Sequence, residues 1–180
     1  DASLWCWGTN DRGQLGTGRR DASPHPEPTR LDDLAGAVDV ALAAGHGCAV
    51  DVRGSVWCWG ASGGGVLGSM DAAIQAPTVV AGIEGAVEVT AGLGHSCARD
   101  EAGDVWCWGS NAFGQLGRTP ADDEPHPEPA RVEGLPHPAI SLAAGDEHVC
   151  ALLDDDSAWC WGSNALAALA QGALDPEPHP

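Results

Sequence analysis

Seven cysteines are the side chains of this 180-residue chain best suited to covalent chemistry, and six of them form evenly spaced pairs. Ten positions separate the members of each pair, with a short turn such as residues 51–54 between them. If the flanking segments form a hairpin, paired cysteines lie opposite each other, where Cα separations of about 4.5–5.5 Å suit a disulfide. The spacing therefore predicts an oxidising compartment and three disulfides, Cys48–Cys58, Cys97–Cys107 and Cys150–Cys160.

Zinc coordination and free buried thiols are the alternatives to these disulfides. A histidine lies two positions before the first cysteine of each pair and shares its strand face, at His46, His95 and His148. With the opposing cysteine, each unit offers three metal ligands, whereas structural zinc normally takes four, and no Cys-x-x-Cys spacing occurs. We expect no metal site, and we expect the histidines to be structural because an active site needs one constellation rather than three copies.

Cys6 is the seventh cysteine and has no partner at this spacing. A partner at the same interval would lie about ten residues upstream of it, before Asp1. The other end of the chain, residues 175–180, reads as the beginning of a further proline-rich strand. We therefore expect both ends to fall inside repeat units, Cys6 to be unpaired, and the remaining units to belong to a longer parent chain.

Other motifs give no catalytic or cofactor-binding residues. The glycines at 63–65 lack the Gly-Lys-Ser/Thr of a phosphate loop, and neither Gly-x-Ser-x-Gly nor His-Glu-x-x-His occurs. The acidic runs at 32–33, 122–124 and 154–156 lack the spacing of a calcium loop. Weak metal binding by His25 or His126, within two Pro-His-Pro-Glu-Pro segments, is a minor alternative to stiff, proline-rich loops.

Eight tryptophans, against one Phe and no Tyr, occur as four copies of Trp-Cys-Trp-Gly. In a strand the two tryptophans of each copy point to one face and the cysteine to the other. Each indole can bury about 150–250 Å². Because the pairs recur at one place in every unit, we expect structural packing between neighbouring units from Trp5, Trp7, Trp57, Trp59, Trp106, Trp108, Trp159 and Trp161. The alternative, in a partial arc, is that the terminal pairs lie uncovered.

The elements that position these residues are short strands. Segments 38–42, 87–91 and 139–143 alternate apolar with polar or small residues, which is typical of strands. A His-x-Cys strand, a Trp-Cys-Trp strand and a short extended piece after a proline cluster (28–31, 77–80 and 129–132) follow in turn. Four strands in about 50 residues predict antiparallel β-propeller blades in an all-β domain, with units at 1–48, 49–97, 98–150 and 151–180.

These repeats resemble the RCC1 (regulator of chromosome condensation) family. The resemblance is carried by Trp-Gly-x-Asn followed by Gly-Gln-Leu-Gly at residues 7–16 and 108–117, and by the His-x-Cys and Trp-Cys-Trp-Gly strands. It implies a propeller that closes with seven blades, of which this chain holds about three and a half. The paired cysteines suggest a bacterial secreted type. Two units depart from the pattern, at residues 62–66 and at 164–170, where both loop glycines are lost.

Charge restricts the partner without naming it. The chain has 26 acidic residues and 8 basic residues, and every basic residue is an arginine. The net charge is −18. Nucleic acid is a poor partner, because phosphate binding needs clustered cations. No segment reaches the roughly 18 apolar residues of a membrane span. We expect a non-enzymatic binding module, extracellular or on the cell surface, whose blade-connecting loops contact a protein. The alternatives are a nucleotide-exchange and chromatin role and a propeller enzyme acting on cell-wall or other polysaccharide.

Overall fold

The computed structural model describes every residue except 1, 72–75, 166, 170–174 and 180, and consists of strands with one short 3-10 helix, η1 (Gly63–Gly65). A two-stranded sheet holds β1 (Ser3–Asn10) and β2 (Asp21–Ala35). The three four-stranded sheets hold β3 (Ala37–Leu42), β4 (His46–Asp51), β5 (Val56–Gly60) and β6 (Thr78–Val79); β7 (Ala86–Ala91), β8 (His95–Asp100), β9 (Val105–Asn111) and β10 (Asp122–Arg131); and β11 (Ala139–Ala144), β12 (His148–Leu153), β13 (Ala158–Asn164) and β14 (Asp175–His179).

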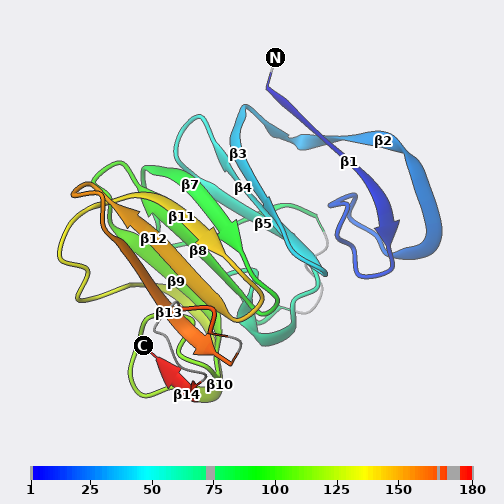
Figure 1. Cartoon of the computed structure of the whole chain (residues 1–180). Helices are drawn as coiled ribbons and strands as arrows, with labels where there is room; N and C mark the ends of the chain where they lie inside the picture. Colours follow the sequence, from blue (N-terminus) through cyan, green and yellow to red (C-terminus); the bar gives the residue numbers. More distant parts are fainter. Residues whose placement is uncertain (1, 72–75, 166, 170–174, 180) are drawn as a thin grey trace.

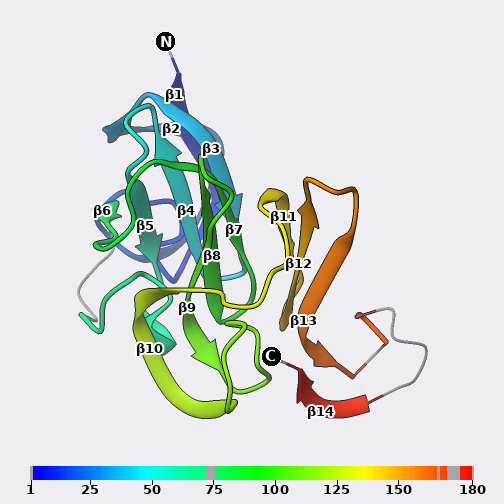
Figure 2. The same cartoon turned by 90° about the vertical axis from the view of Figure 1, so that its left-hand side faces the viewer.

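Each four-stranded sheet is an antiparallel meander whose strands follow chain order. The sheets stand side by side, from the two-stranded sheet at the N-terminal end to the β11–β14 sheet (Figure 1). In Figure 2 the strands β6 and β10 lie at the outer ends of their sheets, while β7 and β11 face each other between the third and fourth sheets. The predicted all-β architecture of four-stranded propeller blades is confirmed.

The register of the two central strands repeats from sheet to sheet. Cys48 lies opposite Cys58 and His46 opposite Gly60, and the same pairing recurs between β8 and β9 and between β12 and β13. Gly60 has a φ of 104°, and a Cβ there would lie 2.5 Å from the Gly45 carbonyl oxygen. The same close approach occurs at Gly109 and Gly162, and a positive φ, which favours glycine, is common to all four motif glycines, including Gly8.

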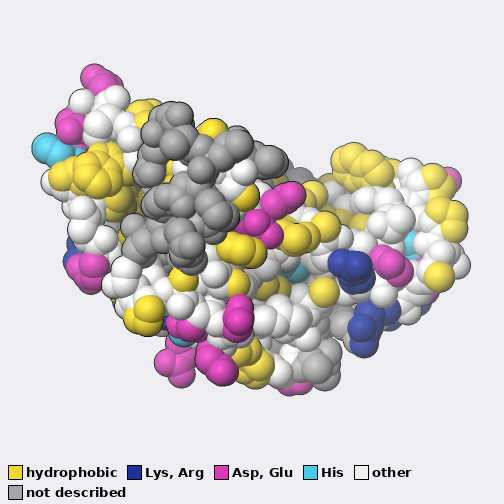
Figure 3. Space-filling view, turned by 60° about the horizontal axis from the view of Figure 1, so that its bottom comes forward, with side chains coloured by type: hydrophobic (Ala, Val, Ile, Leu, Met, Phe, Trp, Pro, Cys, Tyr) yellow, Lys and Arg dark blue, Asp and Glu magenta, His cyan; other side chains and the backbone are white. Residues whose placement is uncertain are grey.

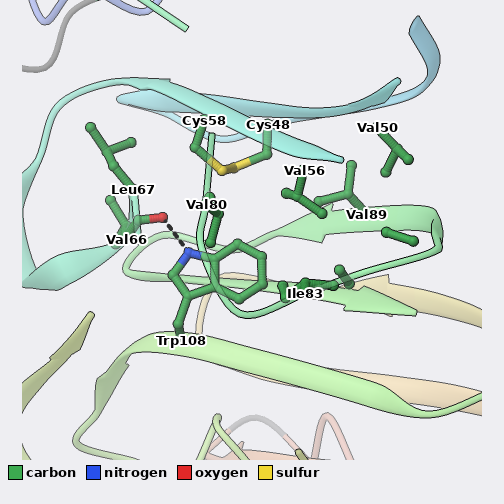
Figure 4. Packing of buried hydrophobic residues seen from close by; sticks show 12 residues of the cluster. Cys48, Val50, Val56, Cys58, Val66, Leu67, Val80, Ile83, Val89 and Trp108 are labelled. Atoms are coloured by element: carbon green, nitrogen blue, oxygen red, sulfur yellow. Dashed lines mark hydrogen bonds between the residues drawn. A yellow bond between two sulfur atoms is a disulfide. The ribbon is translucent and has the colours of Figure 1, made fainter. Parts of the chain in front are cut away.

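The hydrophobic core lies between neighbouring sheets. One cluster joins Val50, Val56 and Val80 of the second sheet to Val89 and Trp108 of the third (Figure 4). A second cluster joins the third and fourth sheets around Trp161, and a third joins the first and second around Trp59. Each sheet thus buries apolar side chains against its neighbour, as stacked repeats must.

The outer strands differ from the prediction in length. β2 covers 15 residues and β10 covers 10, so both include the Pro-His-Pro-Glu-Pro segments that were expected to be loops, whereas β6 has only two. Register shifts interrupt the pairing of β2 with β1 and of β10 with β9, because proline cannot donate a backbone hydrogen bond to a regular ladder. The unit boundaries at 48/49, 97/98 and 150/151 fall inside β4, β8 and β12, so sheets and sequence units are offset and the boundaries stay a prediction.

Candidate functional site

The paired cysteines meet across the two central strands of each four-stranded sheet. The S–S distances are 2.05 Å for Cys48–Cys58, 2.11 Å for Cys97–Cys107 and 2.08 Å for Cys150–Cys160. Their Cα separations of 4.1–4.2 Å are slightly shorter than the range expected from the hairpin. The structure therefore places the three predicted pairs at disulfide-bonding distance, and their oxidation in the isolated protein is a prediction tested below.

Cys6 occupies the same motif position in β1 and is a free, buried thiol. It packs with Leu15, Leu31 and Leu34 in the cluster between the first and second sheets. Burial raises the pKa of the Cys6 thiol, since the thiolate loses hydration there. Only 7% of the surface of Cys6 is exposed.

In the three four-stranded sheets, the second tryptophan of the motif joins adjacent sheets. Trp59 donates a hydrogen bond from Nε1 to the Gln14 carbonyl (2.9 Å), and Trp108 donates to the Val66 carbonyl (2.8 Å; dashed in Figure 4). Trp161 repeats this contact with the Gln115 carbonyl, at 3.1 Å. In each case the acceptor lies in the loop after the Trp-Cys-Trp strand of the preceding sheet. Trp7 holds the same position in β1, yet 61% of its surface is exposed.

The first tryptophan of each motif has a more local role. Trp57 donates to Asp51 Oδ2 (3.1 Å), and Trp106 donates to Asp100 Oδ2 (3.3 Å) at the hairpin turn of the same sheet. The fourth sheet has Leu153 at the position of these aspartates, and its Trp159 is 45% exposed. The indole is therefore covered only where the turn supplies a carboxylate.

Asp51 shows how tightly this turn is built. Its burial opposes ionisation, but hydrogen bonds from the Ser55 amide, the Trp57 indole and the Arg53 amide overcome that effect and lower the pKa of Asp51 to about 2. The carboxylate is thus a fixed hydrogen-bond acceptor rather than a group that exchanges protons near neutral pH.

The three motif histidines lie in one row from sheet to sheet but differ in their partners. His46 Nε2 contacts Ser96 Oγ of the next sheet at 2.9 Å, and that hydroxyl donates to the Val66 carbonyl at 3.1 Å. His46 is therefore the donor, with its proton on Nε2. Neither ring nitrogen of buried His95 has a partner among the described residues, and His148 is half-buried.

Burial lowers the pKa of both buried histidines to about 4. For His95, the neighbouring His46 and His148 add to this effect because two nearby positive charges repel each other. Both rings are accordingly neutral at physiological pH. Buried, neutral rings agree with the structural role that the sequence predicts for these histidines, which stays a prediction.

Metal-binding clusters of three or more His, Cys, Asp or Glu side chains do not occur among the described residues. His25 and His126, the minor candidates, each contact a carboxylate four residues earlier, Asp21 at 2.8 Å and Asp122 at 2.9 Å. Within the described part of the chain, no helix is long and apolar enough to cross a membrane.

Sequence reasoning missed a set of carboxylates that link the inner strands. Asp39 Oδ2 of β3 accepts from the Val89 amide of β7 at 2.8 Å. Glu88, the equivalent residue of β7, accepts from the Leu142 amide of β11 at 2.9 Å and from Arg99 Nε at 2.8 Å. The only sign of these contacts in the sequence is an acidic residue in the middle of an apolar strand, at the same place in two units.

A family model described as the regulator of chromosome condensation (RCC1) repeat matches residues 1–50, 53–99 and 102–152, and a second model of the same description matches 86–115 and 139–166. The chain belongs to the RCC1 repeat family. Among curated relatives, E3 ubiquitin-protein ligase HERC2 of Mus musculus is 32% identical over 180 residues, which is 97% of this chain and 3% of that protein. Protein RCC2 homolog of Xenopus laevis is 40% identical over 70 residues, or 38% of this chain and 13% of that protein.

Two solved structures of this RCC1-repeat fold superpose closely on the chain. Human WBSCR16 gives a TM-score of 0.85 at 22% identity, covering 99% of this chain and 51% of that one. Yeast RCC1 (Prp20), solved bound to Kap60, gives a TM-score of 0.82 at 20% identity, covering 99% of this chain and 43% of that one. At these identities the similarity shows the fold alone. This chain spans about half or less of each of these proteins.

Proposed function

We propose that this chain is a non-enzymatic protein-interaction scaffold, an RCC1-like propeller segment whose blade-connecting loops contact a protein partner. The observation that carries the proposal is the use made of the repeated polar side chains. The buried indoles bond to backbone carbonyls, buried His46 bonds to a serine hydroxyl, and Asp51 caps its own turn. Groups that are occupied in packing leave recognition to the loops that differ between sheets.

The loops carry exposed apolar side chains that the packing does not use. The single methionine, Met70, is 57% exposed in the loop between β5 and β6. The single phenylalanine, Phe113, is 36% exposed in the loop after β9. Methionine and phenylalanine are enriched in the contact surfaces between proteins.

The partner we propose has a basic or mixed surface. Acidic side chains are spread over the face shown in Figure 3, and the few arginines on it gather toward one side. With a net charge of −18, the chain attracts cationic surfaces over distances of about a Debye length, roughly 8–10 Å. We propose a location outside the cell or on its surface, of the bacterial secreted type; the three cysteine pairs are compatible with the extracellular location.

A nucleotide-exchange and chromatin role is the second candidate, favoured by membership of the family that is named for the regulator of chromosome condensation. The same acidity that favours a basic protein surface opposes contact with the phosphates of chromatin.

Affinity capture from the surface and secreted fractions of the source cells tests the proposal. We expect the chain without substitutions to retain one defined protein at physiological salt. Phe113→Asp should reduce the recovery of that protein about tenfold, as loss of a central contact does. Val52→Asp, at a turn where the side chain is still more exposed (68% for Val52 against 36% for Phe113), is the control and should retain the partner. Failure to retain any protein, or stimulation of nucleotide exchange on a GTPase, would contradict the scaffold proposal.

A further inference from the structure

Three of the eight arginines have side chains without a partner, and all three lie in one loop. The other five are held within the chain: Arg30, Arg53, Arg99 and Arg131 by carboxylates and Arg118 by the Cys107 carbonyl. Arg12, Arg19 and Arg20 form no side-chain hydrogen bond or ion pair with the described residues, and all three are exposed. They belong to the loop of residues 11–20, which joins β1 to β2 (Figure 1). The free cations of this acidic chain are therefore gathered at one place.

The acidic residues at the two ends of this loop are held by other groups. Asp11 Oδ1 accepts from Gln14 Nε2 at 3.1 Å. Asp21 Oδ2 accepts from Asn10 Nδ2 at 3.1 Å, and His25 Nε2 lies 2.8 Å from Asp21 Oδ1. Because neither carboxylate is bonded to a guanidinium, the three arginines keep their N–H donors for a ligand.

Asn10 fixes the backbone from which the arginines project. Its side chain is buried, accepts from the Leu15 amide at 3.2 Å and donates to the Arg19 carbonyl at 3.0 Å. The Gly13 amide donates to the Asn10 carbonyl at 3.1 Å and closes the first turn of the loop. A loop that is already ordered loses little backbone entropy when it binds a partner.

The equivalent loop of the third sheet shows that these positions face solvent. Pro120 is the counterpart of Arg19, since the motif asparagine of its sheet donates to its carbonyl in the same way. Phe113 is the counterpart of Arg12, directly before the Gly-Gln-Leu-Gly segment. Both counterparts are exposed, although the third sheet packs against a neighbour on each side. The exposure of Arg12 and Arg19 is therefore a property of the loop.

A small pocket beside Arg19 carries charges of both signs. It has a volume of about 220 Å³, lies between β2 and the residue before β6, and is lined in part by Arg19, Arg30, Asp32 and Asp33. Arg30 Nε is paired with Asp32 at 3.2 Å, so Arg19 is the cation with free donors. The two aspartates and the net charge of −18 oppose a dense polyanion such as a chain of phosphates. A single carboxylate, which can pair with one guanidinium, fits this mixture of charges better.

We propose that the loop of residues 11–20 is a docking surface for an acidic segment of the partner protein, whose aspartate or glutamate side chains pair with Arg12, Arg19 and Arg20. The planar guanidinium group binds a carboxylate through two parallel N–H···O bonds. Arginine is also enriched among the residues that dominate the affinity between proteins. This inference rests on the proposed function, because it names the chemistry of the partner at one of the loops.

Titration of the whole chain into a dye-labelled hexaglutamate peptide, followed by fluorescence anisotropy, tests the proposal. We expect saturable binding at low salt that is about tenfold or more tighter than binding of the matched hexaglutamine peptide. The affinity should fall as salt is added, because exposed charges are screened. A labelled thymidine hexanucleotide should bind more weakly than hexaglutamate, because the surrounding acidic residues oppose phosphates.

Two double variants separate the loop from the net charge. Arg19→Ala with Arg20→Ala should weaken hexaglutamate binding about fivefold to tenfold, through the loss of exposed ion pairs. Arg53→Ala with Arg131→Ala removes the same charge from accessible side chains outside the loop, and should change the affinity by less than about twofold. Equal losses in the two double variants, equal binding of hexaglutamine, or tighter binding of the hexanucleotide would overturn the proposal.

The capture experiment distinguishes this inference from the proposed function. Lower recovery of the captured protein with Arg19→Ala and Arg20→Ala would support docking of an acidic segment. Unchanged recovery with these two substitutions, while Phe113→Asp still reduces it, would overturn the acidic segment and leave the scaffold proposal intact. If no protein is retained at all, the scaffold proposal fails, and the hexaglutamate titration still decides whether the loop binds carboxylates.

Discussion

At the residue scale, the motif histidines show how one substitution in a neighbouring sheet changes a buried group. Ser96 provides the hydroxyl that receives His46 Nε2, and the equivalent residue of the fourth sheet is Val149. His95 therefore faces a position without a hydroxyl, and both of its ring nitrogens are unpaired among the described residues. A buried polar group left in this state costs about 1–3 kcal/mol.

Val149→Thr should repair this defect. Threonine keeps the shape of valine, and its hydroxyl can accept from His95 and donate to the Gln115 carbonyl, the counterpart of the Val66 carbonyl that Ser96 uses. We expect the free energy of unfolding to rise by about 1 kcal/mol in urea titrations. The control, Val105→Thr, buries a hydroxyl in an apolar cluster and should cost about 1–3 kcal/mol. Equal losses in the two variants would show that His95 gains nothing from the hydroxyl.

The pKa values of about 4 for His46 and His95 predict a pH dependence of stability. In the unfolded chain both titrate near 6.5, so between about 6.5 and 4 the unfolded state binds more protons. Stability contributed by the neutral rings is complete above the unfolded pKa and is lost as pH falls to about 4.

The free energy of unfolding, measured by urea titrations and plotted against pH across this range, should have a slope that corresponds to about two protons. His95→Gln should reduce this slope to about one proton. A free energy of unfolding that stays constant from pH 6.5 to 4 would be incompatible with neutral, buried rings.

At the element scale, the carboxylates of the inner strands tie one sheet to the next. Glu88 accepts from the Leu142 amide, the Ser141 hydroxyl and Arg99, and so joins β7 to β8 and to β11. Hydrogen bonds to charged groups are worth about 1.5–3 kcal/mol, more than neutral pairs.

Glu88→Ala should lower the free energy of unfolding by about 1.5–3 kcal/mol, because it removes these contacts and leaves the Leu142 amide unpaired. Glu101→Ala, at an exposed turn of the same sheet, should change it by less than about 0.5 kcal/mol. Thermal unfolding followed by circular dichroism measures both. Similar small effects would mean that the inner strands are held by apolar packing alone.

Strand positions and cysteine pairing at this scale could be predicted from sequence because they depend on periodicity and on spacing along the chain. β3, β7 and β11 begin and end within one residue of the predicted segments. The contacts of Glu88 could not be predicted, since they depend on where the next sheet lies in space. After Asn164, two features of the motif loop are kept although its glycines are lost. The Asn164 side chain accepts a hydrogen bond from the Leu169 amide at 3.0 Å, as Asn10 does from the Leu15 amide, and Ala167 has the positive φ of the lost glycine.

At the scale of the whole molecule, the cysteine pairs connect the fold to its environment. Each pair closes a ten-residue hairpin, and the chain-entropy account gives roughly 2.5–3 kcal/mol of stabilisation for each bridge. Bridges of this kind persist in an oxidising compartment. The proposed location outside the cell depends on this oxidation pattern.

Counting thiols in the protein isolated without reductant, then denatured and alkylated, tests this pattern most directly. We predict one alkylated cysteine, Cys6, with peptide mapping that links Cys48 to Cys58, Cys97 to Cys107 and Cys150 to Cys160. Alkylation of all seven cysteines would contradict a disulfide-linked scaffold in an oxidising compartment.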